Sequence, residues 1–350
     1  MTRQPNISAT DIGSWIWRLS DLGNTVVRNI QRSQQRDQES LRKAIGFAGG
    51  DTIFAIDREV EPLILVQINS WLRSGDLDKL FPLILICEGL GENGIMCFGP
   101  KESKPKWRLI IDPIDGTRNI MYDKRSAWFI AAVAPNLGPE TSVADAVVSM
   151  MLEIPPSRQT ARSIFITQSN ARGIRTLQKD INSETVSKIK AVPSTATSLQ
   201  YGFAQVANFF PGTKVLASEL MERIVSKTLG DQEEGSALVF EDQYISTAGQ
   251  MVELILGHDR FCCDLRPLFY QILEKETNQK VRGLECHPYD VAGITIAQKA
   301  GVIITDGLGN ELCPPMDVHT PVHWCGYANK SLRRQIEPVI LEWLREKGIF

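Results

Sequence analysis

Residues 107–117 read Trp-Arg-Leu-Ile-Ile-Asp-Pro-Ile-Asp-Gly-Thr. The mostly apolar run 107–111 is typical of a buried strand. It meets Asp112-Pro113, and proline has no backbone N–H with which to continue strand pairing. We therefore expect a strand that halts at Asp112 and a sharp turn directly after it.

Two carboxylates, Asp112 and Asp115, stand three residues apart at the mouth of this strand. Carboxylates, together with substrate phosphate oxygens, are the usual ligands of Mg²⁺. The Ile114 carbonyl oxygen lies between them, and the backbone N–H groups of Gly116 and Thr117 could cradle a phosphate. The same spacing also fits a tight turn whose aspartates only accept backbone hydrogen bonds. By itself the stretch leaves both interpretations open.

Outward from this stretch, apolar periodicity and turn residues predict a mixture of helices and strands. This mixture indicates an α/β or α+β layered protein. Residues 159–197 are polar and show no clear pattern. We expect helices at 11–38, 58–72, 214–228, 248–256, 289–300 and 332–347, and strands at 51–56, 81–89, 126–133, 144–153, 236–240, 257–261, 302–305 and 322–328.

Composition argues against several classes of protein. The 350 residues carry a net charge of -3 with scattered basic residues, which does not favour a nucleic-acid binder. No apolar run approaches the ~18 residues that a membrane span needs, and the N-terminal residues lack the apolar core of a signal peptide. Seven cysteines without a CxxC pair do not suggest a disulfide framework or a structural zinc site. A reducing cytoplasm is the simplest expectation.

The hexapeptide 112–117, DPIDGT, resembles the hallmark of the inositol monophosphatase and fructose-1,6-bisphosphatase superfamily of lithium-sensitive phosphatases, and most of all the inositol monophosphatase family. Three other segments resemble the same superfamily in the right order. They are 50–61 (GDTIFAIDREVE), 87–89 (CEG) and 289–306, where YDVAG precedes an apolar helix and the strand AGVIITD. Together the four segments favour the metal site over the plain turn.

The resemblance implies a layered αβαβα fold in two lobes, residues 1–185 and 186–350, with the metal site between them. It also implies in-line attack of water on phosphorus without a phosphoenzyme, one ion activating the water and another stabilising the leaving alkoxide. Two or three Mg²⁺ ions are expected. The implied metal ligands are Asp57, Glu88, Asp112, the Ile114 carbonyl, Asp115 and Asp290; the implied catalytic residues are Glu88, Thr117 and Asp112; and the implied substrate contacts are Asp115, Gly116, Thr117, Thr247 and Asp290.

The activity implied is a phosphomonoesterase acting on inositol monophosphate or a related sugar or polyol phosphate, in a cytoplasmic homodimer. Fructose-1,6-bisphosphatase and 3'-phosphoadenosine-type nucleotide phosphatase are the alternatives. A catalytically inactive regulatory homologue is the rival from another class, and it has no need for clustered carboxylates, which raise one another's pKa. A bisphosphate substrate would need a basic cluster, for which the candidates are Lys124, Arg125, Arg260 and Arg266.

Several positions depart from the commonest family pattern. Tyr289 stands where tryptophan is usual, and the expected glutamate pair is reduced to Glu88 followed by Gly89, with Glu92 as an alternative to Glu88. The helix start that contacts the substrate's alcohol part matches either 235–237 or 246–249, and we prefer the second, which contains Thr247. Relative to the family pattern, residues 265–283 look like an insertion close to the substrate pocket. His287, three residues before Asp290, is a weaker candidate for reaching the pocket.

Overall fold

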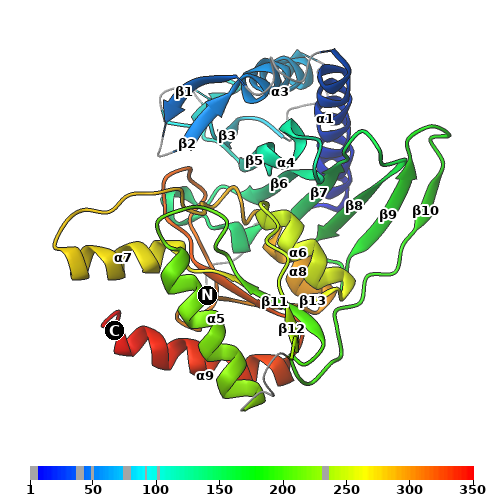
Figure 1. Ribbon diagram of the computed structural model, residues 1–350. Helices are drawn as coiled ribbons and strands as arrows, with labels where there is room; N and C mark the ends of the chain where they lie inside the picture. The colour runs from blue at the N-terminus through cyan, green and yellow to red at the C-terminus, as the bar shows by residue number, and fades with distance from the viewer. Residues whose placement is uncertain are drawn as a thin grey trace.

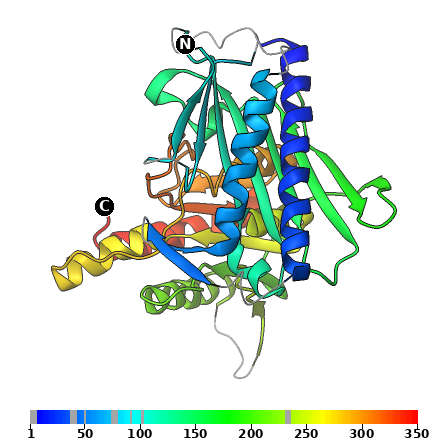
Figure 2. The same ribbon diagram turned by 90° about the horizontal axis from the view of Figure 1, so that it is seen from above.

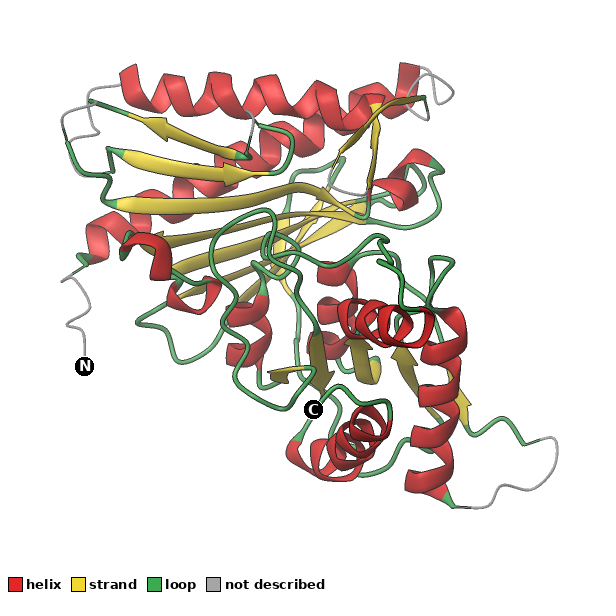
Figure 3. Ribbon diagram, turned by 90° about the vertical axis from the view of Figure 1, so that its left-hand side faces the viewer, coloured by secondary structure: helices red, strands yellow, loops and turns green. Residues whose placement is uncertain are grey.

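The computed structural model describes residues 7–36, 43–48, 51–73, 80–90, 93–100, 103–230 and 236–350. Helices and sheets alternate in layers (Figure 1). Two helices cover the outer face of a large sheet, two more lie between it and a smaller sheet, and further helices cover the far side of the smaller sheet (Figure 3). The predicted layered αβαβα architecture is confirmed.

The larger sheet contains the strand of the DPIDGT stretch. Its eight strands follow the order β10-β9-β8-β7-β6-β5-β3-β4, and only the β3–β5 pair is parallel. A separate antiparallel pair is formed by β1 (Ala44–Ala48) and β2 (Asp51–Phe54). The strands of the larger sheet are β3 (Leu83–Cys87), β4 (Ile95–Phe98), β5 (Trp107–Asp115), β6 (Ala127–Pro135), β7 (Val148–Ile154), β8 (Ala161–Gln168), β9 (Arg175–Asp180) and β10 (Val186–Lys188).

Two long helices, α1 (Ala9–Arg36) and α3 (Ala55–Arg73), lie side by side over the outer face of this sheet (Figure 2). Helix α1 buries Trp15, Leu19 and Leu22 completely against the sheet. Burying such side chains contributes about 1.5–3 kcal/mol each to the free energy of folding. Because α1 packs against α3, this layer also holds the first turn of α3, and with it Asp57, in place.

The smaller sheet has the order β12-β11-β13-β15-β14. Helices α6 and α8 pack between the two sheets, where they bury a second apolar cluster, and a third cluster lies under α5, α7 and α9. The elements are β11 (Gly202–Val206), β12 (Val239–Phe240), β13 (Asp259–Asp264), β14 (Ile303–Asp306), β15 (Trp324–Tyr327), α4 (Thr117–Met121), α5 (Lys214–Leu229), α6 (Thr247–Leu256), α7 (Arg266–Thr277), α8 (Ile294–Ala300) and α9 (Lys330–Glu346), with 3-10 turns at Gly138–Glu140 and Val143–Asp145.

Several sequence-based boundaries differ from the structure. Strand β5 does not halt at Asp112 but continues to Asp115 through a shift in its register with β6, which accommodates the proline. Helix α3 begins at Ala55 rather than 58, because the Asp57 carboxylate accepts a hydrogen bond from Phe54 N and caps the first turn. Residues 143–145 form a 3-10 turn before β7. The polar region 159–197 contains β8, β9 and β10.

The segment after residue 288 also differs from its prediction. It forms turns until α8 begins at Ile294, because the Asp290 carboxylate accepts a hydrogen bond from His287 N at 2.6 Å. Asp290 therefore lies in a turn before the helix, not within it. The predicted insertion 265–283 contains α7.

All seven cysteines are free, and Cys262 and Cys263 are buried as expected. In the part of the chain that the structure describes, no helix is both long enough and apolar enough to span a bilayer.

Candidate active site

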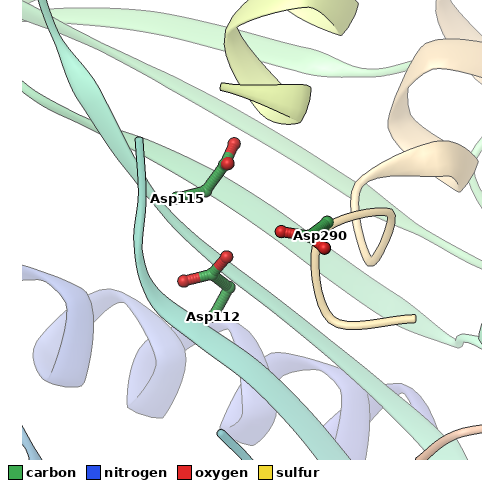
Figure 4. A group of neighbouring side chains, drawn as sticks. All are labelled: Asp112, Asp115 and Asp290. Atoms are coloured by element: carbon green, nitrogen blue, oxygen red, sulfur yellow. The ribbon is translucent and has the colours of Figure 1, made fainter. Parts of the chain in front are cut away.

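Three carboxylates meet where the larger sheet faces the smaller one. Asp112 and Asp115 come from the irregular end of β5, and Asp290 reaches them from the turn before α8 (Figure 4). One oxygen of each lies within 4.8 Å of the others. The prediction that residue 290 joins the pair at 112 and 115 is confirmed as a matter of geometry.

Asp115 is held by the N-terminus of α6. Its carboxylate accepts hydrogen bonds from Ser246 Oγ at 2.7 Å, Thr247 N at 3.2 Å and Ala248 N at 2.6 Å. Ser246 is also the N-cap of α6, since its Oγ accepts from Gly249 N at 2.9 Å. Of the two candidate stretches for the substrate-side helix start, the structure therefore brings 246–249 to the site. The first residue of the other stretch, 235, lies outside the described residues.

Burial dominates the titration of the three groups. It raises the pKa of Asp115 to about 6 although the hydrogen bonds from Ser246 and the start of α6 oppose the shift. Burial, followed by repulsion from Asp115 and other carboxylates, raises the pKa of Asp112 and of Asp290 well above their usual range. Deprotonating all three together thus requires compensating positive charge, which a divalent cation can supply.

Thr117 links the metal motif to α3. Its Oγ lies 3.0 Å from Asp57 Oδ1 and 2.9 Å from the Ile114 carbonyl oxygen. Because a hydroxyl has one proton, it donates to one of these oxygens at a time. Gly116 precedes it at φ 91°, and a Cβ there would lie 2.9 Å from Ile245 O. Only glycine lets the motif pass this close to the start of α6.

Glu88 and Gly89 follow β3 and line the same cleft, together with Glu61 of α3. Gly89 has a φ of 79°, and a Cβ there would lie 2.3 Å from Glu61 Oε1. The Glu61 carboxylate thus occupies the space that a side chain at 89 would take, and burial raises its pKa. Sequence reasoning gave Glu61 no role, although it lies one helical turn after Asp57 and so on the same face of α3. Glu92 lies outside the described residues.

The cleft also has a cationic and aromatic wall, of which the sequence analysis had named only Arg266. Phe54, Arg118, Phe209 and Phe210 line it, together with Arg266. The Arg266 guanidinium is buried and bonded through Nε to both carboxylate oxygens of Asp264, at 2.9 and 3.0 Å. Burial alone would lower the pKa of Arg266, but Asp264 outweighs it and raises the pKa. No sequence pattern marks Phe209 and Phe210 as pocket residues.

Other predicted residues lie elsewhere. Of the four basic candidates for a second phosphate, only Arg266 lines the cleft, whereas Arg125 pairs with Asp242 at 2.7 Å and Arg260 bonds to the Ser198 carbonyl oxygen at 2.8 Å. His287 does not line the cleft. Its ring stacks on Tyr289, and its backbone N–H supports the Asp290 carboxylate.

No protein-family model and no curated protein matches the sequence. Solved structures do match over nearly the whole chain. A fructose-1,6-bisphosphatase of Leishmania major in its holo form is 14% identical with a TM-score of 0.63, covering 95% of this chain and 93% of its own. The extragenic suppressor protein suhB of Bartonella henselae is 14% identical with a TM-score of 0.60, covering 93% and 98%.

An inositol monophosphatase (IMPase) of Thermotoga maritima is 15% identical with a TM-score of 0.57, covering 94% of this chain and 98% of its own. Sequence identities this low show only that the fold is shared. The chemistry has to be argued from the residues of the site. The chain therefore has the fold of the inositol monophosphatase and fructose-1,6-bisphosphatase structures, as the DPIDGT resemblance predicted.

Proposed function

We propose that this protein is a metal-dependent phosphomonoesterase that hydrolyses a small phosphate ester. One observation carries the proposal: three carboxylates, the buried Asp112 and Asp115 of β5 and the half-buried Asp290 of the distant turn before α8, converge within 4.8 Å. Burial raises the pKa of each, and repulsion from neighbouring carboxylates raises the pKa of Asp112 and of Asp290 further. Folding alone gains nothing from such an arrangement, so a ligand of opposite charge is its physical explanation.

The donor set fits Mg²⁺, which binds carboxylate and carbonyl oxygens and keeps positions for phosphate oxygens. We propose that Asp112, Asp115 and Asp290 hold the ions with the Ile114 carbonyl and Glu88, and that Asp57 helps to hold a further one. The chemistry that such ions supply is neutralisation of phosphoryl charge and a lower pKa for the attacking water.

The remaining steps belong to the chain's own groups. The backbone N–H groups of Gly116 and Thr117 cradle the phosphate at the start of α4. When the Thr117 hydroxyl donates a hydrogen bond to the Asp57 carboxylate, 3.0 Å away, the lone pairs of the hydroxyl oxygen can accept a hydrogen bond from water. Thr117 and Glu88 then orient that water for attack on phosphorus. Thr247, at the start of α6, contacts the alcohol part of the substrate.

Within this reaction class we propose a sugar or polyol phosphate such as inositol monophosphate, with fructose 1,6-bisphosphate and a 3'-phosphonucleotide as the alternatives to be compared. The two-lobe division near residue 185, the homodimer and the lithium sensitivity are further proposals that rest on the sequence resemblance, and the cytoplasmic location is one that rests on the cysteine usage. An inactive regulatory homologue is disfavoured because it would retain the repulsion among the carboxylates without a use for it.

The test is phosphate release from these three substrates and from p-nitrophenyl phosphate, with Mg²⁺ or with EDTA. Asp112→Asn and Asp290→Asn should each lower kcat/KM by about 10³-fold, because several kcal/mol of metal-derived stabilisation is lost. Asp180→Asn, at the half-buried end of β9 outside the cleft lining, is the matched control. Release that persists in EDTA or in Asp112→Asn would refute the proposal, as would no release from any substrate with Mg²⁺.

A further inference from the structure

Two ring side chains, His287 and Tyr289, pack together beside the carboxylate cluster. Their rings are stacked, with centroids 5.4 Å apart and an angle of 14° between the planes. The Tyr289 hydroxyl lies 3.2 Å from His287 Nδ1, and it also hydrogen-bonds to the Glu88 carboxylate. Tyr289 is 6% exposed and lines the cleft, as Glu88 does. The hydroxyl group therefore joins the turn before α8 to the end of β3.

The chemistry of the partners sets the direction of these two hydrogen bonds. A phenol has one proton to donate, and an ionised carboxylate can only accept. Tyr289 therefore donates to Glu88 when that carboxylate is charged, and the phenol oxygen accepts a hydrogen bond from His287 Nδ1–H. The separation of 4.0 Å between His287 Nδ1 and Asp290 Oδ2 agrees with a hydrogen on this nitrogen. His287 thus holds the hydroxyl group in the orientation that serves Glu88.

Glu88 needs such a partner more than the buried carboxylates of the site do. Asp112 and Asp115 are buried, and backbone N–H groups of Ile114 and of α6 hold their carboxylates. Glu88 is exposed and follows the end of β3, so packing does not restrict its long side chain. A hydrogen bond from the buried Tyr289 ring to one carboxylate oxygen selects one orientation of that side chain and leaves the other oxygen to bind a ligand.

We propose that Tyr289 is a positioning residue that holds the Glu88 carboxylate toward the attacking water. This inference rests on the proposed phosphatase function, in which Glu88 and Thr117 orient that water. Tyr289 acts through Glu88 and does not itself contact the reacting atoms. Tryptophan, which is usual at this position of the family pattern, has no hydroxyl group, so the arrangement is a property of this chain.

The test removes the hydroxyl group and keeps the ring. For the ester that the wild type hydrolyses fastest, Tyr289→Phe should lower kcat about 10-fold and change KM by less than about 2-fold, because Glu88 acts on the water and not on the alcohol part of the substrate. In a Glu88→Ala background the same change should leave the remaining kcat unaltered, since the group that Tyr289 positions is gone. Isothermal titration calorimetry should show a lower Mg²⁺ affinity for Tyr289→Phe than for the wild type, and no such difference in the Glu88→Ala background.

Tyr244→Phe is the matched control, because Tyr244 is 4% exposed and lies outside the cleft lining. Its hydroxyl group also accepts one hydrogen bond, from Trp128 Nε1 at 3.0 Å, and donates one, to the Ser126 carbonyl oxygen at 2.9 Å. Tyr244→Phe should leave kcat and the Mg²⁺ affinity at their wild-type values. The comparison separates the role of Tyr289 from the general loss of a buried hydroxyl group.

Equal kcat and equal Mg²⁺ affinity in Tyr289→Phe and the wild type would overturn the assignment of Tyr289 and leave the phosphatase proposal intact. A loss of kcat that is just as large in the Glu88→Ala background would also overturn it, because Tyr289 would then act independently of Glu88. No hydrolysis of any ester by the wild-type protein would instead refute the phosphatase proposal.

Discussion

Asp264 and Asp112 are both buried carboxylates beside the same cleft, yet their charges are balanced in different ways. Asp264 is 1% exposed and pairs with the Arg266 guanidinium group, so the chain provides its own counter-ion. Asp112 is 7% exposed and lies among Asp115, Asp290 and Glu88, which raise its pKa further. The first arrangement is completed by folding, whereas the second requires positive charge from solution. The contrast separates an internal ion pair from a site built for a ligand.

The largest expected effect breaks the internal pair. Asp264→Ala leaves the Arg266 guanidinium group buried without its counter-ion, and should lower the free energy of unfolding by about 3–5 kcal/mol. Urea denaturation measures this. Asp242→Ala removes the exposed partner of Arg125 and should cost at most about 1 kcal/mol. If the two substitutions lowered the free energy of unfolding equally, the buried pair of Asp264 and Arg266 would not stabilise the fold more than the exposed pair does.

The second prediction concerns pH and the carboxylate cluster. In metal-free protein, native Asp115 has a pKa of about 6 against the ordinary 3.8, so the folded state retains a proton that the unfolded state has lost. The free energy of unfolding contributed by this group therefore falls as pH rises from about 4 to above 6, by about 2–3 kcal/mol. Urea denaturation in EDTA should show Asp115→Asn gaining stability relative to wild type across this window. If the difference in the free energy of unfolding between the two proteins did not change with pH, the raised pKa of Asp115 would be contradicted.

Magnesium should reverse that trend, because it binds the deprotonated folded state and not the unfolded chain. Adding Mg²⁺ above pH 7 should raise the melting temperature of the wild type more than that of Asp115→Asn. The loss of stability caused by Asp264→Ala should not depend on Mg²⁺. This difference would distinguish the internal ion pair from the carboxylate cluster more sharply.

A smaller effect comes from the support of Asp115. Ser246→Ala removes the hydrogen bond of 2.7 Å to its carboxylate, which should raise the pKa of Asp115 and weaken Mg²⁺ binding about 10-fold. Isothermal titration calorimetry measures the affinity. Ser142→Ala is the control, since Ser142 also begins a helical turn but bonds to Asp145 instead. Unchanged affinity in Ser246→Ala would show that Asp115 does not depend on this bond to bind metal.

The smallest expected effect tests the space taken by Glu61. Gly89→Ala forces a Cβ against the Glu61 carboxylate at a φ of 79°, and Gly138→Ala creates a similar backbone strain at 84° with nothing within 4 Å. Both should lower the free energy of unfolding by about 1 kcal/mol or more. Gly89→Ala should lower the free energy of unfolding more than Gly138→Ala does. Of the two substitutions, only Gly89→Ala should weaken Mg²⁺ binding. Identical losses would mean that Glu61 moves aside freely.

Predictions from the sequence were best where one local stretch carried the information. The run before Asp112 and the helical periodicity after Asp11 predicted β5 and α1 within a few residues. They failed where a side chain redirected the backbone, as Asp57 does at the start of α3 and Asp290 does before α8. Strands β9 and β10 were missed because none of their side chains is fully buried, so they lack a clear apolar alternation, and the apolar run of β8 is only the three residues 164–166.

The sequence by itself determined the chemical character of this protein: carboxylates at a strand end, a glycine that permits close approach, and a threonine beside them. The residues of this motif are close neighbours in the chain, so the motif can be recognised from the sequence alone. The sequence resemblance also implied that Asp290 joins Asp112 and Asp115, and the fold brings the three together. Only the tertiary structure decided that Glu61 fills the space beside Gly89, and that Arg118 lies between two phenyl rings. These contacts join residues far apart in the chain, and the packing of helices and sheets against one another, rather than local propensity, brings them together.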